Sequence, residues 1–499
     1  MKQFFAKNKN RIALACITAL SFLLGLLFLG QKDLSLDEVA TAIIVQNFSS
    51  MLHILTYTEG NMWLYYFLLH FWQGVGTNEF ALRLLSVLFG TASIPVIYLL
   101  SKKLFNTKTA LIVTLLTVVN VFFISNEQNA RAYSLVLLLT TCSSYFFTMY
   151  VLSFLKDKKM QKKYLLLTII FNVLGVYAHF YTLFVIASQI TALLLTRKKE
   201  LIRSLLYYLL AIGICLLPLF LAPSLRGQPT NWIPVPGLRN LIGTILILSD
   251  DFPPVAVLYI ALFVGVFISL WNKRKQLNLF SITYWNIYYL LIGLILPIVV
   301  SFLFSLFIKP LYISLYFFIC LVPFTLLISY FITQIKKPLL QKALIISLVI
   351  LSSIRLYGWY TGNQYLQVVI SNNTEDWRGV AKLLGTDKNT SDVVLFFPPF
   401  VQENVNYYLQ KNNSNFDKKK EINLQPGIYA GANGLKNFNL QQLLEIPLHY
   451  HSLWYIYGTY TDNTRLKQQK LINQMLAKNY MLQKEVKFYN LTAYYYIRK

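Results

Sequence analysis

Two adjacent carboxylates, Asp37 and Glu38, are the residues of this chain best suited to chemistry. They come about seven residues after the first apolar run, and acids are scarce, with 20 Asp and Glu against 45 Lys and Arg in 499 residues. A carboxylate beside a membrane face can accept a proton or bind a ligand. Neighbouring positions on a helix point about 100° apart. We therefore expect one of the two, Asp37, to act as the base and Glu38 to support it.

The same pair also has a structural explanation. Ser35 and Glu38 have the spacing of a capping box, in which the acidic side chain binds the backbone at the start of a helix. Asp37 would then be favoured in the first turn by the helix dipole. Because one side chain can cap a helix and also catalyse, both interpretations remain open at this stage.

The composition excludes a soluble globular protein. The mean hydropathy is +0.51, and 56% of the residues are hydrophobic against 13% charged. Repeated apolar runs of about 18 or more residues indicate an α-helical polytopic membrane protein, for which we expect about 11 transmembrane helices. The net charge of +25 is explained by basic loops on one side of a membrane, so no nucleic-acid partner is expected.

Loop charge predicts the orientation. Short basic clusters recur in alternate loops, which places those loops and the N-terminus in the cytoplasm. The chain is then a multi-pass protein of the cell membrane with its C-terminal segment outside. The basic clusters are Lys102-Lys103, 156–163, 197–199, 273–275 and 336–337.

The sequence divides at about residue 358. Residues 1–357 are expected to form the transmembrane domain, with interfacial helices in a first outer loop at 31–79 that carries the acidic pair. Residues 358–499 are more polar and predict a small extracytoplasmic α/β domain. Its strand-like runs and one helix-like run are 393–397, 453–457 and 401–410.

Three later segments carry a family resemblance. Asn61–His70 is similar to a Leu-Tyr-Tyr segment, Asn78–Ser86 to a Ser-Glu-x-x-x-Arg-x-x-Ser signature, and Ala130–Leu135 to a Glu-Ala-Arg-x-Tyr-Ser-Leu stretch. With the acidic pair and the outer domain, they make the chain resemble the GT-C glycosyltransferases. The resemblance is to the protein O-mannosyltransferase and aminoarabinose transferase family (glycosyltransferase family 39). It covers about residues 30–135 and beyond that is mainly one of topology.

Two positions depart from the family pattern. Asn129 stands where many relatives have the Glu of the third motif, and Leu315 replaces the Arg that precedes Tyr316 in an Arg-Tyr pair. The second departure removes a cation that relatives would bring to a phosphate.

The resemblance implies transfer of a sugar from a polyprenyl-phosphate donor, of undecaprenyl or dolichyl type, to an acceptor on the extracytoplasmic side. Inversion at the anomeric carbon follows from direct displacement by an acceptor hydroxyl that Asp37 deprotonates. The acceptor is a lipid, a glycan or a protein, and membrane lipid surrounds the enzyme. The alternatives are a transporter or flippase for an envelope glycolipid, or a non-enzymatic membrane sensor. A transporter predicts ionisable residues deep in mid-span, whereas here the charges crowd at the helix ends.

Further residues are candidates for binding the donor phosphate or the substrate. Arg131 is the first, with an i,i+4 pair to Glu127 as its structural alternative. The sequence indicates no definite cofactor, and it does not decide whether the protein uses a divalent metal ion. Asp250 and Asp251, just before Pro253, are more typical of a turn than of a metal site. The other candidates are Arg83, Tyr133, His179 and Glu59.

Overall fold

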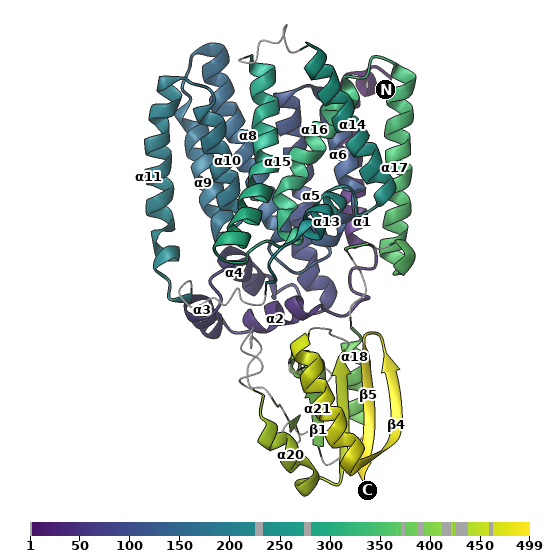
Figure 1. The fold of residues 1–499 in the computed structure, drawn as a ribbon. Helices are drawn as coiled ribbons and strands as arrows, with labels where there is room; N and C mark the ends of the chain where they lie inside the picture. Colours follow the sequence, from purple (N-terminus) through teal and green to yellow (C-terminus); the bar gives the residue numbers. More distant parts are fainter. Residues whose placement is uncertain are drawn as a thin grey trace. The chain divides into compact units, whose positions relative to one another are not determined.

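The computed structural model forms two compact units (Figure 1). One is helical and contains most of the chain up to Asn372; the other combines Gln31–Ile43 with Asn373–Lys499. The residues that the structure describes are 2–224, 233–273, 281–366, 368–370, 375–386, 393–398, 400–411, 421–422, 424, 438–458 and 463–499.

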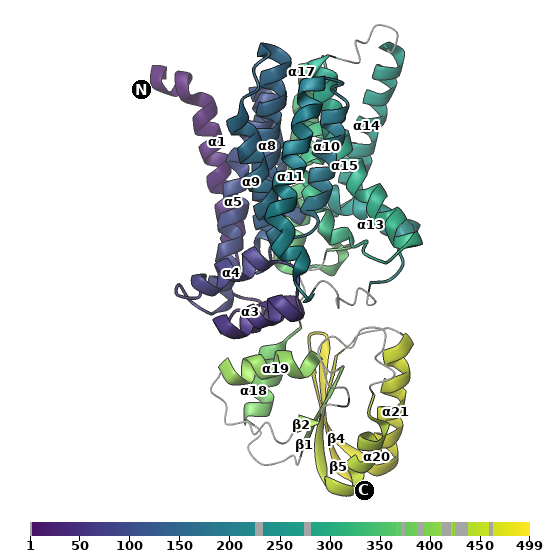
Figure 2. The same cartoon turned by 90° about the vertical axis from the view of Figure 1, so that its left-hand side faces the viewer.

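Long helices run side by side through the helical unit, and the short helices α3 and α4 lie at one end of it in both views (Figures 1 and 2). Its elements are α1 (Lys2–Leu26), α3 (Phe48–Tyr57), α4 (Trp63–Trp72), α5 (Glu79–Leu104), α6 (Thr107–Val118), α7 (Val121–Glu127), α8 (Tyr133–Asp157), α9 (Lys162–Ala178), α10 (Thr182–Leu194), α11 (Lys199–Leu221), α13 (Leu238–Leu248), α14 (Pro253–Lys273), α15 (Ile282–Phe307), η2 (Ser314–Cys320), α16 (Leu321–Thr333), α17 (Pro338–Thr361) and η3 (Gln364–Leu366).

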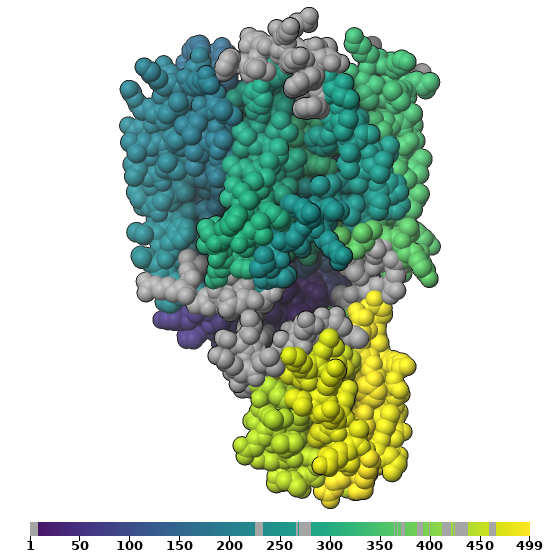
Figure 3. Space-filling view, in the orientation of Figure 1, coloured from purple at the N-terminus to yellow at the C-terminus, as the bar shows by residue number. Residues whose placement is uncertain are grey.

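Within the described residues, seven helices are long and apolar enough to cross a membrane, or up to ten if each of three bent pairs is one span. The sequence led us to expect about 11. Two of the expected spans, α9 and α10, have only 17 and 13 residues, because they share one short stretch of chain. Exposed apolar side chains of α11, α15 and α17 form part of the outer surface (Figure 3), as expected of helices that face lipid.

Asparagines fix where several helices begin. The side chains of Asn47, Asn78, Asn106 and Asn120 each accept a hydrogen bond from a backbone N–H in the first turn that follows, at 2.8 to 3.0 Å. Such caps satisfy donors that have no partner inside the helix. They set the starts of α3, α5, α6 and α7, and therefore the positions of the side chains one turn later.

The Asp250-Asp251 turn joins α13 to α14, which are bent by 91°. The turn predicted from the sequence is present, and it carries a buried ion pair: Asp251 Oδ2 lies 2.8 Å from Arg355 Nη2 of α17, with both side chains 0% exposed. The Asp251 carboxylate also accepts the backbone N–H groups of residues 368–370 at 2.9 to 3.2 Å. This buried cluster ties the α13–α14 bend to the end of α17.

The second unit is a small α/β domain. Its five-stranded sheet has the order β2-β1-β3-β5-β4, in which β1 pairs in parallel with β2 and β3, and β5 pairs antiparallel with β3 and β4. Its elements are α2 (Leu36–Ile44, all but its last residue), α18 (Trp377–Thr386), β1 (Val393–Phe397), α19 (Phe400–Lys411), β2 (Glu421–Ile422), α20 (Leu440–His449), β3 (Ser452–Gly458), α21 (Asn463–Asn479), β4 (Tyr480–Phe488) and β5 (Leu491–Arg498).

The predicted strands at 393–397 and 453–457 are confirmed as β1 and β3, and the helix after the first is confirmed as α19. Alternate residues of β1 and β3 pack with α20 and α21 into one apolar core. The hairpin of β4 and β5, not predicted from the sequence, extends the sheet by antiparallel pairing.

Candidate functional site

The three motif segments meet at the turn before α8. Tyr65 of α4 hydrogen-bonds Ser86 of α5 through their hydroxyls at 2.9 Å, and the Ser86 hydroxyl donates to the carbonyl of Arg131 at 3.3 Å. The Arg131 Nη1 in turn donates to the hydroxyl of Tyr66 at 3.3 Å. Residues far apart in the sequence therefore hold the Arg131 backbone and its guanidinium, which is itself buried.

The structural alternative for Arg131 is wrong. Glu127 makes no ion pair with Arg131 among the contacts of the described residues. Its carboxyl receives a hydrogen bond from Ser21 of α1 at 3.3 Å. It also lies where a Cβ on Gly90 of α5 would stand. Glu127 therefore points into the α1–α5 interface, and the i,i+4 spacing is not used.

His179 occupies the turn between α9 and α10, as predicted. Its Nδ1 accepts the backbone N–H of Tyr181 at 3.2 Å. Its Nε2 is buried and has no hydrogen-bond partner among the described residues. Burial and, to a smaller extent, the charge of Arg131 lower the pKa of His179 to about 3. The ring is therefore neutral at physiological pH, with its single proton on Nε2.

Aromatic rings surround this histidine. Tyr316 of η2 lies 5.0 Å from the His179 ring, Tyr181 lies 5.5 Å away, and Tyr133, the first residue of α8, lies 6.0 Å away, all between centroids. The Tyr181 hydroxyl donates to the carbonyl of Leu311 at 2.6 Å, which fixes its ring. We call His179, Tyr133, Tyr181 and Tyr316 the aromatic cluster.

The motif at Asn61 reaches the same turn. Asn61 Oδ1 accepts the backbone N–H of Phe180 at 3.3 Å, next to His179. Asn129, at the position of the relatives' Glu, has a buried Oδ1 without a hydrogen-bond partner among the described residues. A buried amide oxygen and a buried imidazole N–H are both costly to leave unpaired. Each of the two residues therefore keeps a hydrogen-bonding group that no described residue uses.

Two other candidates lie elsewhere in the helical unit. The Arg83 Nη1 donates to the carbonyl of Leu29 at 3.0 Å, so this buried guanidinium stabilises the segment that follows α1. Glu59 lies just after α3, and its backbone N–H donates to the carbonyl of Ile54 at 2.8 Å. Neither residue is one of the four that define the aromatic cluster.

The acidic pair begins α2 in the second unit. Glu38 Oε2 accepts the backbone N–H of Ser35 at 2.9 Å, so the capping contact predicted from the sequence is formed. Glu38 is 2% exposed, whereas Asp37 is exposed. The two acids therefore differ in environment, with Glu38 committed to the helix start and Asp37 open to solvent.

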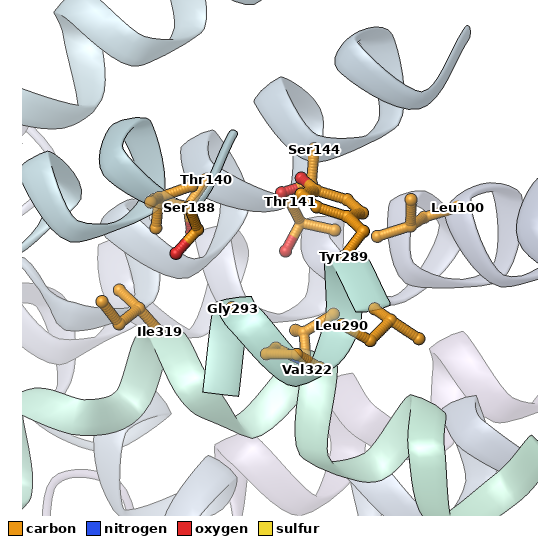
Figure 4. Close-up of a pocket in the computed structure, with 12 residues that line it drawn as sticks. Leu100, Thr140, Thr141, Ser144, Ser188, Tyr289, Leu290, Gly293, Ile319 and Val322 are labelled. Carbon is orange, nitrogen blue, oxygen red and sulfur yellow. The ribbon is translucent and has the colours of Figure 1, made fainter. Parts of the chain in front are cut away.

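A small pocket, with a cavity volume of about 40 Å³, lies in the helical unit (Figure 4). Hydroxyl-bearing side chains of α8 and α10 face apolar ones of α15, η2 and α16 across it. Its wall includes Val185 and Ile319, about one helical turn beyond Tyr181 and Tyr316 of the aromatic cluster. Lining it are Leu100, Thr140, Thr141, Ser144, Val185, Ser188, Tyr289, Leu290, Gly293, Ile319, Val322 and Pro323.

Three of the hydroxyls that line this pocket already donate hydrogen bonds within the protein. Thr140, Thr141 and Ser188 donate to carbonyls of their own helices at 2.6 to 2.8 Å. A lining whose donors are satisfied internally presents carbon to its contents. The pocket therefore suits a hydrocarbon chain rather than a polar ligand.

No group of three His, Cys, Asp or Glu side chains with the geometry to hold a metal occurs in the described part of the chain. Three residues of this candidate site were not among the candidates from the sequence: Tyr66, Tyr181 and Tyr316. Each had a signal: Tyr66 is the second Tyr of the Leu-Tyr-Tyr segment, Tyr181 lies two residues after His179, and Tyr316 is the Tyr of the altered Arg-Tyr pair.

Comparisons with known proteins find one family model that is similar to part of the chain. Residues 62–223 match the family model for dolichyl-phosphate-mannose-protein mannosyltransferases. The sequence comparison with curated proteins finds no significant match.

Among solved structures, ArnT from Cupriavidus metallidurans in the apo state is similar at a TM-score of 0.61 and 10% identity, over 98% of both chains. The same protein bound to undecaprenyl phosphate gives 0.59, again at 10% identity over 98% of both chains. The apo oligosaccharyltransferase of Archaeoglobus fulgidus gives 0.53 at 10% identity, over 97% of this chain and 75% of that one. The helical fold of this chain is thus similar to the folds of ArnT and of the oligosaccharyltransferase, and its motif region, residues 62–223, matches the mannosyltransferase family model.

Proposed function

We propose that this protein transfers a sugar from a polyprenyl-phosphate donor to an acceptor on the extracytoplasmic side of the cell membrane, with inversion. The observation that carries the proposal is the convergence of three motif segments on Arg131, near a neutral histidine whose Nε2–H is unpaired among the described residues. A similar fold with undecaprenyl phosphate bound, that of ArnT, supports the choice of lipid class.

In this proposal Arg131 and His179 bind the donor phosphate. A guanidinium and a neutral imidazole N–H can both donate to phosphate oxygens, and a hydrogen bond to a charged group contributes about 1.5–3 kcal/mol. Because the imidazole is neutral, it adds a donor without repelling the adjacent guanidinium. This pair would replace the cation that Leu315 removes from the family's Arg-Tyr site.

The pocket below the aromatic cluster supports the lipid part of the donor. A polyprenyl chain attached to a phosphate at Arg131 needs an apolar space that begins within about one helical turn. The pocket meets that need, since its lining is apolar or internally hydrogen-bonded. With a cavity volume of about 40 Å³, it has room for about one isoprene unit of the donor.

Catalysis then proceeds by one displacement. An acceptor hydroxyl attacks the anomeric carbon from the face opposite the phosphate, and Asp37 takes its proton. The bond between that carbon and the phosphate oxygen breaks, and polyprenyl phosphate leaves with one more negative charge. Arg131 and His179 would stabilise this charge as it develops. The acceptor is a lipid, a glycan or a protein.

Sugar transfer by the purified protein in lipid nanodiscs tests the proposal. Polyprenyl-phosphate donors carrying different labelled sugars are offered with envelope lipid, glycan and peptide acceptors. We expect Arg131→Ala to lower kcat/KM for the donor by about 10- to 100-fold, which corresponds to the lost charged hydrogen bond. Arg203→Ala, which removes an exposed arginine near the start of α11, is the matched control and should have no effect.

Failure of the wild-type protein to transfer any of these sugars would refute the proposal. The accompanying orientation has its own test. A reporter that is active only outside the cytoplasm should be active after Lys499 and silent near Lys158; the reverse pattern would place the acidic pair on the wrong side.

A further inference from the structure

The segment that precedes the acidic pair is held by the C-terminal part of the chain. Asp33, four residues before Asp37, forms an ion pair with Arg378 of α18. Its Oδ2 also accepts the backbone N–H of Arg378 at 2.8 Å. Asp33 is 7% exposed. Both oxygens of a buried carboxylate are therefore used by one residue 345 positions later in the chain.

The next residue is held by the neighbouring helix. The backbone N–H of Leu34 donates to the hydroxyl of Tyr408 in α19 at 2.8 Å, and Leu34 is fully buried. The Arg378 guanidinium lies 5.8 Å from the centroid of the Tyr408 ring, within the range of a cation–π interaction. Arg378 and Tyr408, which contact Asp33 and Leu34, therefore also contact each other.

The N-terminus of α18 has two acceptors. Asp33 Oδ2 accepts the backbone N–H of Arg378, and Asp376 Oδ1 accepts that of Gly379, each at 2.8 Å. The same contact restrains the loop before α2, where Asp33, Leu34 and Ser35 are each fixed by a hydrogen bond. A helix whose preceding residues are fixed has a fixed start and direction.

We propose that the C-terminal domain positions the catalytic carboxylate. Arg378 and Tyr408 act as positioning residues: they hold residues 33–35, and these set the place of Asp37 in the first turn of α2. The inference rests on the proposed role of Asp37 in sugar transfer. It makes the C-terminal domain part of the catalytic apparatus, whatever acceptor it also contacts.

The kinetic test is a double-mutant cycle on sugar transfer by the full chain. We expect Asp33→Ala and Arg378→Ala each to lower kcat by about 10- to 100-fold, the scale of losing a well-positioned reacting group. The double variant should lose no more than Asp33→Ala alone, because that substitution already removes both contacts with residue 378. The donor KM should stay unchanged, since Arg131 and His179 bind the donor in the helical unit. Lys382→Ala, at an exposed position one turn along α18, is the matched control.

Tyr408→Phe gives a second readout that keeps the ring. It removes the acceptor for the Leu34 N–H, so hydrogen exchange of the peptide that covers residues 31–44 should become faster. We expect kcat to fall by about 5-fold, the effect of one neutral hydrogen bond. Tyr455→Phe is the control, because the buried hydroxyl of Tyr455 has no hydrogen-bond partner among the described residues.

The outcomes separate the two proposals. An active wild type whose three variants keep its kcat would overturn the positioning role while leaving sugar transfer intact. Additive losses in the double variant would also overturn it, since the residues would then act separately. A wild type that transfers no sugar would overturn the proposed function and, with it, this inference.

Discussion

Breaking the buried ion pair between Asp251 and Arg355 should strongly destabilise the helical unit. Both side chains are 0% exposed and 2.8 Å apart. Arg355→Met leaves a carboxylate buried without its cation, a change that typically costs about 3–5 kcal/mol. The backbone N–H groups of residues 368–370 still donate to Asp251. They offset part of the loss, so we expect about 3 kcal/mol.

Removing both charges should cost less than removing one. In the double variant Asp251→Asn with Arg355→Met no charge remains buried, and Asn tolerates the left-handed backbone at this position, where φ is 48°. We expect the double variant to lose about 1–2 kcal/mol, less than the loss of about 3 kcal/mol in Arg355→Met, which implies a coupling energy of at least about 1 kcal/mol between the two sites.

The measurement is equilibrium unfolding in mixed micelles, followed by tryptophan fluorescence. Arg203→Met, at an exposed position, controls for loss of an arginine as such. If Arg355→Met stays within about 1 kcal/mol of the wild type, or the double variant loses the sum of the single losses, the reasoning is refuted. The pair would then contribute no net stability to the α13–α14 bend.

Two further predictions concern the acidic pair and the α1–α5 interface. Asp37→Asn should lower the rate of sugar transfer by about 10²–10⁴-fold, as loss of a positioned base does. Glu38→Gln should lower the rate less, because Gln also serves in a capping box. Equal transfer by Asp37→Asn and wild type, per folded molecule, would remove Asp37 from the mechanism. Gly90→Ala should destabilise the protein by about 1–3 kcal/mol, because the new methyl group overlaps the Glu127 side chain. Gly213→Ala is the control: its methyl group would have no atom within 4 Å, so the change should be neutral or stabilising. Equal melting temperatures for the two variants would contradict this packing.

Local sequence signals predicted the elements that local physics determines. The β-rich runs at 393–397 and 453–457 form strands, and Glu38 caps its helix at the spacing read from Ser35. The number of spans was harder to predict, because a hydropathy run does not show where a helix bends. The run through 109–125 is two helices, α6 and α7, at 63° to each other.

The candidate site was predictable where the side chains lie close in sequence to a motif. Arg131 and His179 were chosen for their residue types, but their partners could not be found that way. Tyr66 reaches Arg131 from 65 residues earlier, and Tyr316 lies beside His179 from a segment after α15. The i,i+4 spacing of Glu127 and Arg131 suggested a pair that tertiary packing prevents, since room at Gly90 draws Glu127 towards α5.

The bonds from Asp33 and Leu34 to α18 and α19 also bear on how the protein is made. Ribosomes synthesise chains from the N-terminus, so residues 31–43 emerge early and wait for partners encoded more than 340 residues later. Until the last quarter of the chain has been translated, these contacts cannot form. A nascent chain that ends before α18 would contain the helical unit and both acids of the pair, yet lack the contacts that restrain residues 33 and 34. The segment before the acidic pair is therefore restrained only at the end of synthesis.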